Sequence, residues 1–221
     1  NQSLINYFKK YIDVVDEPEK ADYFYSFKDD LRATYDESIS CNHNIVPHAH
    51  SSGVLVNTYW ENKSNKPLFE LTLSHKNNGN KILEKIGLKT NDWFAVSHVR
   101  ESSYKGAENF RDSDIETYFK AYKNIVSKGG WIIRIGDNKM KRLPKMNRVI
   151  DYAHSEFKSD WMDIFLCAQA KFMIGTSSGP SVISYIFGTP VALTNNLPSS
   201  AIYLGSKDLF IPRLMKYKNN T

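Results

Sequence analysis

A short run of hydroxyl-bearing and small residues, Gly175-Thr176-Ser177-Ser178-Gly179, stands between an apolar stretch and Pro180. Proline suits the first position of a helix, because its missing N–H would have had no partner there. The free N–H groups and the positive dipole end of such a helix attract an anion, and Ser177, Ser178 and Ser181 add hydroxyl donors. The run therefore predicts a phosphate-binding turn. A tightly packed strand-to-helix turn without a ligand is the alternative.

Charged residues follow two further apolar runs. His98 and Arg100 lie two residues apart, so in a strand both would project from the same face. A guanidinium can bind a phosphate with two hydrogen bonds and offset the charge that grows on a departing diphosphate. Arg134 and Asp137 repeat this arrangement. The alternatives are structural: an ion pair of Arg100 with Asp137 or Glu101, and a solvated pair of Arg134 with Asp137.

Two other groups of residues have candidate roles. Asp151 and His154 follow another apolar run and could receive a ribose or a base, although a satisfied turn before a helix explains them equally well. Glu101 is the best-placed carboxylate for a general base, with Asp137 behind it. His48 and His50 could serve instead, or merely be solvated.

The scaffold for these residues is predicted by the apolar pattern from Asn91 onward. Strand-type runs alternate with helical periodicity there, which predicts an α/β protein with a parallel sheet and helices on its faces. Ligands of such sheets bind beyond the carboxyl ends of the strands. Ser113 and Glu116 are spaced as a capping box. The expected strands are 93–99, 131–135, 149–151 and 171–174, and the expected helices are 115–126, 161–168 and one from Pro180 to Gly188.

Before this region the pattern is weaker. Residues 41–53 have the composition of a loop, and a helix around 79–86 is expected to end at Gly87. We therefore expect two parts, an N-terminal region of residues 1–90 and a sheet domain of residues 91–221. Because the chain begins at Asn1 without methionine, it is expected to be a piece of a longer protein.

Composition limits the class of protein. The chain has 221 residues, of which 41% are hydrophobic and 24% charged, as in soluble globular proteins. No secretory signal or apolar run long enough to cross a bilayer is present. Cys41 and Cys167 do not make a disulfide framework, which favours the cytoplasm. The formal net charge of +5 favours anionic partners, but acids are interspersed with the bases, so nucleic acid is not expected.

Several of these segments together resemble a family of bacterial glycosyltransferases, over about residues 59–212. More distantly, the His98-Val99-Arg100 motif and the segment from Asp163 to Ser181 are similar to the donor-binding half of GDP-fucose-dependent fucosyltransferases. Those enzymes have a type-B architecture of two Rossmann-like domains. The segments that carry the family resemblance are HVRE at 98–101, FRDSDIETY at 110–118, GGWIIRIGD at 129–137, VIDYAHS at 149–155 and SDWMDIFLCAQAKFMIGTSSGPS at 159–181.

The resemblance implies that residues 91–221 form a Rossmann-like nucleotide-sugar-binding domain and that residues 1–90 are a partial acceptor-side region. It places Arg100 on the β-phosphate and His98 beside the sugar or diphosphate. The fucosyltransferase motif often has a second arginine where this chain has Glu101, which instead matches the bacterial family. The donor-binding candidates are His98, Arg100, Arg134, Asp151, His154, Asp163, Gly175, Thr176, Ser177, Ser178, Gly179 and Ser181, and the catalytic candidates are Arg100, Glu101 and Asp137.

The expected function is the transfer of a sugar from a nucleotide-diphosphate donor, with GDP-sugar favoured, to a glycan or glycoconjugate acceptor in surface polysaccharide synthesis. No Asp-x-Asp pair in a suitable loop is available to hold a bridging cation, so a metal-independent, inverting transfer without a cofactor is expected. His48 and His50 have no third ligand at a matching interval, so we expect no metal there. The expected location is the cytoplasm, including the inner face of the membrane as a peripheral protein.

Two other functions fit the same residues. A sugar-nucleotide epimerase would use the same phosphate site with an acid and base set facing the sugar. A non-catalytic nucleotide- or glycan-binding module would bind without turnover. A basic nucleic-acid binder is less favoured, and it would show a salt-dependent affinity for random oligonucleotides.

Overall fold

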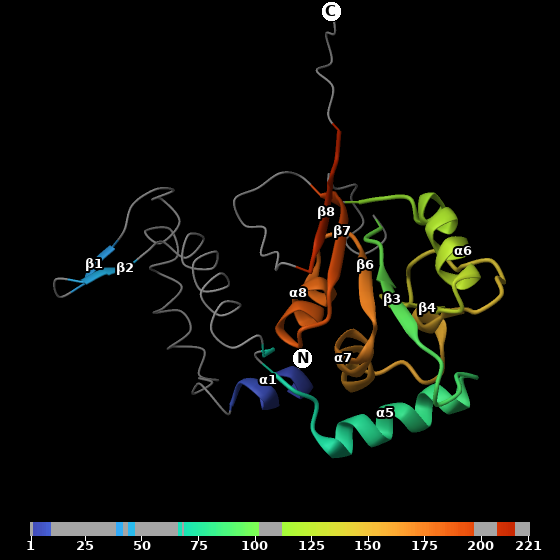
Figure 1. Cartoon of the computed structure of the whole chain (residues 1–221), viewed down its shortest axis with the longest axis horizontal. Helices are drawn as coiled ribbons and strands as arrows, with labels where there is room; N and C mark the ends of the chain where they lie inside the picture. Colours follow the sequence, from blue (N-terminus) through green and yellow to red (C-terminus); the bar gives the residue numbers. More distant parts are fainter. Residues whose placement is uncertain are drawn as a thin grey trace, which may run out of the picture. The chain divides into compact units, whose positions relative to one another are not determined.

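The computed structural model describes residues 2–9, 39–41, 44–46, 66–67, 69–101, 112–196 and 207–214. The chain forms two compact units, residues 1–66 with 199–206, and residues 67–198 with 207–221. In the first unit the described elements are helix α1 (Gln2–Phe8) and the antiparallel strands β1 (Ile39–Cys41) and β2 (Asn44–Val46). The candidate residues at strand ends all lie in the second unit (Figure 1).

The second unit is built on a six-stranded parallel sheet with the order β5-β4-β3-β6-β7-β8 (Figure 1). From β3 the chain adds strands toward one edge, and from β6 it adds strands toward the other edge. This is the order of Rossmann-type sheets, and its reversal point lies between β3 and β6. The predicted α/β fold with a parallel sheet is confirmed. The strands are β3 (Phe94–His98), β4 (Trp131–Arg134), β5 (Val149–Asp151), β6 (Phe172–Gly175), β7 (Val191–Asn196) and β8 (Leu209–Pro212).

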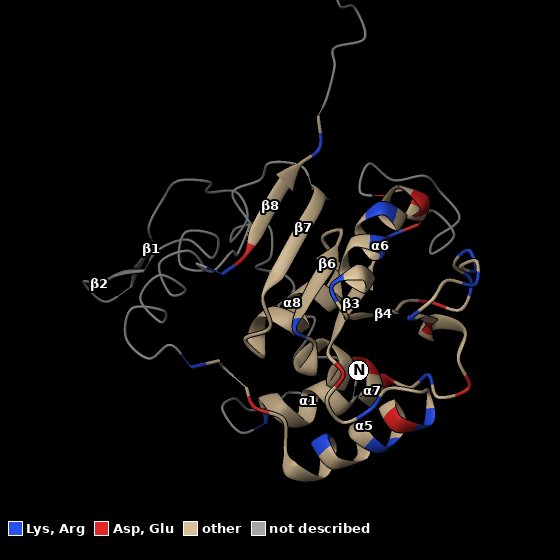
Figure 2. Ribbon diagram, turned by 45° about the vertical axis from the view of Figure 1, so that its right-hand side comes forward, with Lys and Arg blue, Asp and Glu red and all other residues tan. Residues whose placement is uncertain are grey.

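The central strands are apolar because both faces of the sheet are covered. All five residues of β3 are buried, and Ala95, Val96, Ile132 and Ile133 have no exposed surface. Charged residues lie mainly on helices and connecting loops, while the strands are almost free of them (Figure 2). Polar chemistry is therefore confined to the strand ends.

Two sets of helices cover the sheet. The 3-10 helix η2 (Ile115–Tyr118) and α6 (Phe119–Ser127) pack with β4, and the Tyr122 hydroxyl lies 2.6 Å from Ser97 Oγ of β3. The other set contains α5 (Leu73–Lys85), α7 (Asp160–Gln169) and α8 (Gly179–Ile186), with α7 packed against both others. A Cβ at Gly79 would lie 2.3 Å from the Phe165 ring, so this glycine allows α5 to approach α7 closely.

The helix boundaries largely follow the predictions, with two corrections. Helix α5 begins at Leu73, before the expected start near residue 79, because Thr72 Oγ1 accepts a hydrogen bond from His75 N–H and caps it. The predicted Ser113 capping box is wrong. Asp114 caps η2 by accepting from Glu116 N–H, and Ser113 Oγ has no partner among the described residues.

Candidate functional site

The predicted phosphate turn and the Arg100 loop meet at the reversal point of the sheet. His98 at the end of β3 pairs with Gly175 at the end of β6, and Thr176 N–H donates to the His98 carbonyl at 3.0 Å. Arg100 N–H donates to Thr176 Oγ1 at 2.9 Å. A Cβ at Gly175 would lie 1.9 Å from the His98 carbonyl oxygen, so only glycine permits this approach. The two loops thus share one edge, where ligands of such sheets bind.

The hydroxyl groups of the turn are hydrogen-bonded into a fixed arrangement. Ser178 Oγ lies 2.9 Å from His98 Nδ1. Ser181 Oγ donates to the Ser178 carbonyl at 2.7 Å and accepts from Ser178 N–H at 3.2 Å. Ser177 is half-buried, and Gly179, the first residue of α8, is exposed. Pro180 has no N–H, and the Ser181 N–H donates to the Ser178 carbonyl at 3.1 Å, so the group at the start of α8 that can meet an anion is the Gly179 N–H, together with the helix dipole.

His98 is a neutral group at this edge. Its side chain is buried, and burial, followed by the charges of Arg134 and Arg100, lowers its pKa to about 4. At neutral pH the ring therefore carries one proton. His98 contributes a hydrogen-bonding nitrogen to the site, and the positive charge there comes from Arg100.

Arg100 is held at one edge of its guanidinium. Its Nε donates to Asp112 Oδ1 at 3.1 Å, and the two side chains are 16% and 15% exposed. The partner is neither Glu101 nor Asp137, the two carboxylates considered from the sequence. Within the described ranges no hydrogen bond engages the two terminal nitrogens of Arg100. A carboxylate on Nε leaves this pair of donors for a ligand such as a phosphate.

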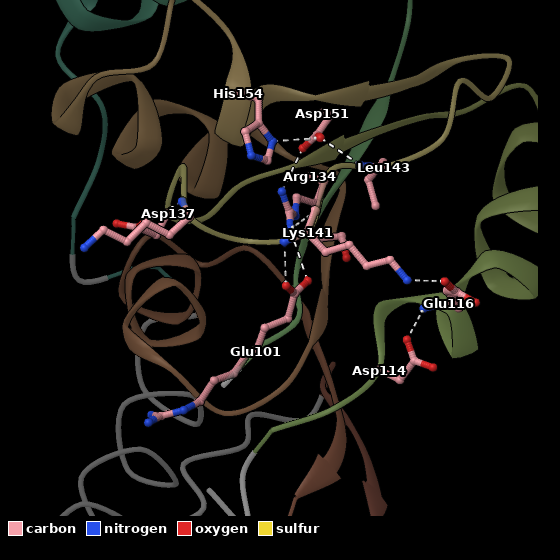
Figure 3. A network of polar contacts seen from close by, with 12 residues as sticks. Glu101, Asp114, Glu116, Arg134, Asp137, Lys141, Leu143, Asp151 and His154 are labelled. Atoms are coloured by element: carbon pink, nitrogen blue, oxygen red, sulfur yellow. Dashed lines mark hydrogen bonds and ion pairs between the residues drawn. The ribbon is translucent and has the colours of Figure 1, made fainter. Parts of the chain in front are cut away.

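Arg134 lies in a different environment. Its side chain has no exposed surface, Nη1 donates to Asp151 at 2.8 Å, and Nη2 donates to Glu101 at 3.2 Å and to the Lys141 carbonyl at 2.9 Å (Figure 3). The solvated pair with Asp137, considered as an alternative, is wrong. Full enclosure favours a role for Arg134 in holding the loop after β4, rather than in touching a ligand.

The two carboxylates considered for the general base are both engaged. Glu101 accepts from Arg134 through Oε1 and from Lys141 N–H through Oε2, at 2.7 Å for the latter (Figure 3). Asp137 accepts from Lys139 N–H at 2.8 Å but is half-buried, so one oxygen is less constrained. These contacts favour Asp137 over Glu101 for a proton acceptor, and they give Glu101 a positioning role.

The remaining candidates lie near the first two helices after β5. Asp151 accepts from Arg134 and from Leu143 N–H, and His154 lies in the 3-10 helix η3 (Tyr152–His154) with its ring against Asp151. Asp163 in the first turn of α7 pairs with Lys158 at 3.2 Å, and burial raises the pKa of its carboxyl group. The described contacts do not connect Asp163 to His98 or Arg100.

Sequence reasoning missed Asp112, which orients Arg100. No local signal identifies this role, because the fold brings Asp112 to Arg100. Asp112 pairs with Arg100, and Asp114 of the same segment caps η2. Among the described residues no group of three or more His, Cys, Asp and Glu side chains could hold a metal ion. His48 and His50 lie outside the described residues.

No helix in the described part of the chain has the length and apolar character needed to cross a membrane. No protein-family model and no curated protein matches the sequence. Solved structures with a similar fold include a glycosyl transferase of family 9 from Veillonella parvula, with a TM-score of 0.47 and 12% identity, covering 65% of this chain and 41% of that one.

A second similar structure is the ADP-heptose LPS heptosyltransferase II of E. coli, with a TM-score of 0.48 and 10% identity over 65% of this chain and 44% of that chain. A third is KpsC of Thermosulfurimonas dismutans, a beta Kdo 2,4 transferase, with a TM-score of 0.37 and 10% identity over 72% of this chain and 60% of that one. The chain thus spans less than half the length of the first two. All three TM-scores are below 0.5, so these structures do not establish a function for this chain.

Proposed function

We propose that the second unit is the nucleotide-sugar-binding domain of a glycosyltransferase. In this proposal it binds the diphosphate of the donor, with a GDP-sugar favoured, for transfer to a glycan or glycoconjugate acceptor in surface polysaccharide synthesis. It works in the cytoplasm or at the inner face of the membrane. The GDP preference rests on the sequence similarity of the His98-Val99-Arg100 and Asp163–Ser181 segments to fucosyltransferases.

The single observation that carries the proposal is the hydrogen-bonded junction of the Arg100 loop with the Thr176–Ser181 turn. It lies between β3 and β6, at the reversal point of the sheet. It combines a fixed positive charge, a neutral imidazole, hydroxyl groups and a helix N-terminus. This combination suits a diphosphate better than a neutral sugar, because each group either donates a hydrogen bond or favours negative charge.

The mechanism follows from where charge develops. When the bond between the sugar and the diphosphate breaks, negative charge grows on the leaving phosphate oxygens. The terminal nitrogens of Arg100 and the Gly179 N–H at the start of α8 would stabilise that charge without reorganising, since Asp112 and the β6–α8 turn already hold them. Direct displacement by an acceptor hydroxyl would invert the sugar carbon, with Asp137 as the proposed proton acceptor.

A panel of nucleoside diphosphates and monophosphates tests the binding step. We expect GDP to raise the melting temperature of the full chain more than UDP, CMP or dTDP. Saturation at 100 times Kd corresponds to about 2.7 kcal/mol, or about 5–10 °C for a chain of this size. The Arg100→Ala variant should lose this shift. If no nucleotide raises the melting temperature, the donor-binding assignment is wrong.

Product analysis with a labelled GDP-sugar separates the candidate reactions. A glycosyltransferase releases GDP and labels the acceptor fraction, whereas an epimerase converts the donor without an acceptor. A binding module gives the thermal shift and leaves the donor unchanged. The label should therefore move only when acceptor glycans are added, and conversion of the donor alone would contradict the proposal.

A further inference from the structure

The ring of His154 lies between two hydrogen-bond acceptors. Its Nδ1 is 2.9 Å from Asp151 Oδ2, and its Nε2 is 3.0 Å from the Asn138 carbonyl oxygen. A carboxylate and a carbonyl can only accept, so both bonds require a proton on each ring nitrogen. A neutral imidazole would leave one nitrogen facing an acceptor without a proton. The side chain is 6% exposed, so water does not readily replace the missing partner.

The charges around His154 support the same protonation state. The buried Arg134 guanidinium contacts two carboxylates, those of Asp151 and Glu101 (Figure 3). With a neutral His154 this cluster would carry one excess negative charge in a largely enclosed place. A protonated His154 gives two cations and two anions, which is the arrangement that burial favours.

The cluster fixes the loop that follows β4. The Asn138 carbonyl accepts from His154, and the Lys141 carbonyl accepts from Arg134. Lys141 N–H donates to Glu101, and Leu143 N–H donates to Asp151. The loop has no helix or strand over 141–146, and these four bonds tie it to the sheet in addition to the packing of Leu143 and Met146 against the core.

This loop borders the proposed donor site. Gly136, at φ +150°, lies so close to the ring of His98 that a Cβ there would be 3.7 Å from His98 Cδ2, and 2.3 Å from Met140 Sδ. His98 in turn contacts Ser178 of the phosphate turn. Asp137, the proposed proton acceptor, is the next residue of the loop. A shift of the loop would therefore move Asp137 and the backbone that lies beside the His98 ring.

We propose that His154 is a positioning residue that carries protons on both ring nitrogens and thereby holds the loop from Gly136 to Leu143 against the donor site. Its functional consequence rests on the proposed function, whereas its protonation does not. The charged groups that face the ring are Asp151 directly and Arg134 through Asp151, with Lys139 and Asp137 next to Asn138 on the loop. Deprotonation would break the bond to Asn138, because the bond to the carboxylate is the stronger one.

Nitrogen NMR of the full chain tests the protonation without any ligand. In two-bond ¹H–¹⁵N spectra at pH 7, a ring with two protonated nitrogens gives two similar nitrogen shifts, and a neutral ring gives two widely separated ones. We expect the first pattern for His154 and the second for His98, whose pKa of about 4 makes it an internal control. A neutral pattern for His154 at pH 7 would overturn the proposal.

The His154→Gln variant tests the positioning role. Its amide can donate only through its nitrogen, so it cannot make both bonds. In His154→Gln we expect GDP affinity to fall about tenfold relative to the wild type, because small displacements of a site cost large factors.

A matched control is His75→Gln, which replaces a histidine on α5 whose Nε2 lies 2.7 Å from the Trp161 carbonyl, outside the cluster. It should keep the wild-type GDP affinity. If His154→Gln keeps that affinity as well, the positioning role is wrong even when the NMR pattern is as expected. If neither the wild type nor the variants bind a nucleotide, the proposed function fails, while the NMR result still decides the state of His154.

Discussion

Arg100 lies just after β3 and Arg134 is the last residue of the neighbouring strand β4, and the surroundings of the two arginines differ. Arg134 is fully enclosed, and its two terminal nitrogens are bound by Asp151, Glu101 and a backbone carbonyl. Arg100 has one carboxylate, on Nε, and its side chain is 16% exposed. Both residues are arginines near the carboxyl end of a strand, so these features do not explain the difference. The difference lies in the number of hydrogen-bond acceptors around each guanidinium: several acceptors give Arg134 a structural role, and a single carboxylate among the described residues leaves Arg100 available to a ligand.

The same contrast extends to the regions around the two arginines. Beyond β4 and β5 the guanidinium of Arg134 is paired with Asp151 and Glu101, so it has no terminal nitrogen left to offer an anion. Beyond β3 and β6 lie one guanidinium, one neutral imidazole and the start of α8, and within the described ranges the carboxylate that pairs with Arg100 is Asp112. The first region supports the fold and the second is open to binding. Four variants test this division.

The largest effect is expected for Arg134→Met. The substitution leaves Asp151 and Glu101 without their cation in a buried place, which typically costs about 3–5 kcal/mol. Urea unfolding of the full chain should therefore show a loss of stability of that size. The control is Lys141→Met, which removes an ion pair with Glu116 between side chains that are 61% and 54% exposed and should therefore cost far less stability. Equal losses for the two variants would contradict the division.

His98 should make the unfolding free energy of the protein depend on pH between about 4 and 7. Its pKa is about 4 in the folded protein and 6.5 in the unfolded chain, so between these values the unfolded state binds more protons. The folded state therefore loses stability as pH falls through this window, by about 3 kcal/mol in full. In His98→Asn this contribution is absent. Between pH 7 and pH 4 its unfolding free energy should fall by about 2–3 kcal/mol less than that of the wild type. Equal falls would show that His98 is not the buried neutral group described here.

Arg100→Lys should affect turnover while leaving the fold intact. A lysine has a single compact ammonium and cannot keep one contact to Asp112 while offering a planar pair of donors. We expect turnover to fall about 100-fold, the cost of removing one charge-stabilising donor, with a melting temperature near that of the wild type. Arg148→Lys is the control, because Arg148 lies over the Trp131 ring and donates to the Gly129 carbonyl. Near-normal turnover of Arg100→Lys would contradict its assignment to the diphosphate.

Much of the sheet could be predicted because its signals are local. The apolar runs of β3, β4, β5 and β6 and the helices between them follow from periodicity within about ten residues. The convergence of the Arg100 loop with the serine turn also follows, since the carboxyl ends of parallel strands meet at one edge. Strand β8 was not predicted. Its residues Leu209 and Ile211 are 67% and 60% exposed, and it lies at the edge of the sheet.

The roles of individual charges could not be predicted, because ion-pair partners are brought together by the fold. Arg134 finds Glu101 33 residues away and Asp151 17 residues away, on two other segments. The carboxylate considered from the sequence as the partner of Arg134 was Asp137, three residues later in the chain. The same holds for Arg100, whose partner Asp112 is 12 residues away. The sequence therefore predicts which residues lie at the carboxyl ends of the strands. The packing of the strands determines which of these residues are paired inside the protein and which can bind a ligand.

The smallest and most selective effect is expected for Gly179→Ala. A Cβ added there meets no atom within 4 Å, so the folded protein has room for it, and alanine is a better helix former than glycine. If Gly179 is glycine only because the fold tolerates it, the variant should match or slightly exceed the wild type in every respect. If a phosphate approaches the Gly179 N–H at the start of α8, the new methyl group stands in its way, and GDP affinity should fall about tenfold at an unchanged melting temperature. Isothermal titration with GDP and thermal unfolding of the same sample distinguish the two. Unchanged affinity would remove the start of α8 from the site and leave Arg100 to bind the diphosphate without it.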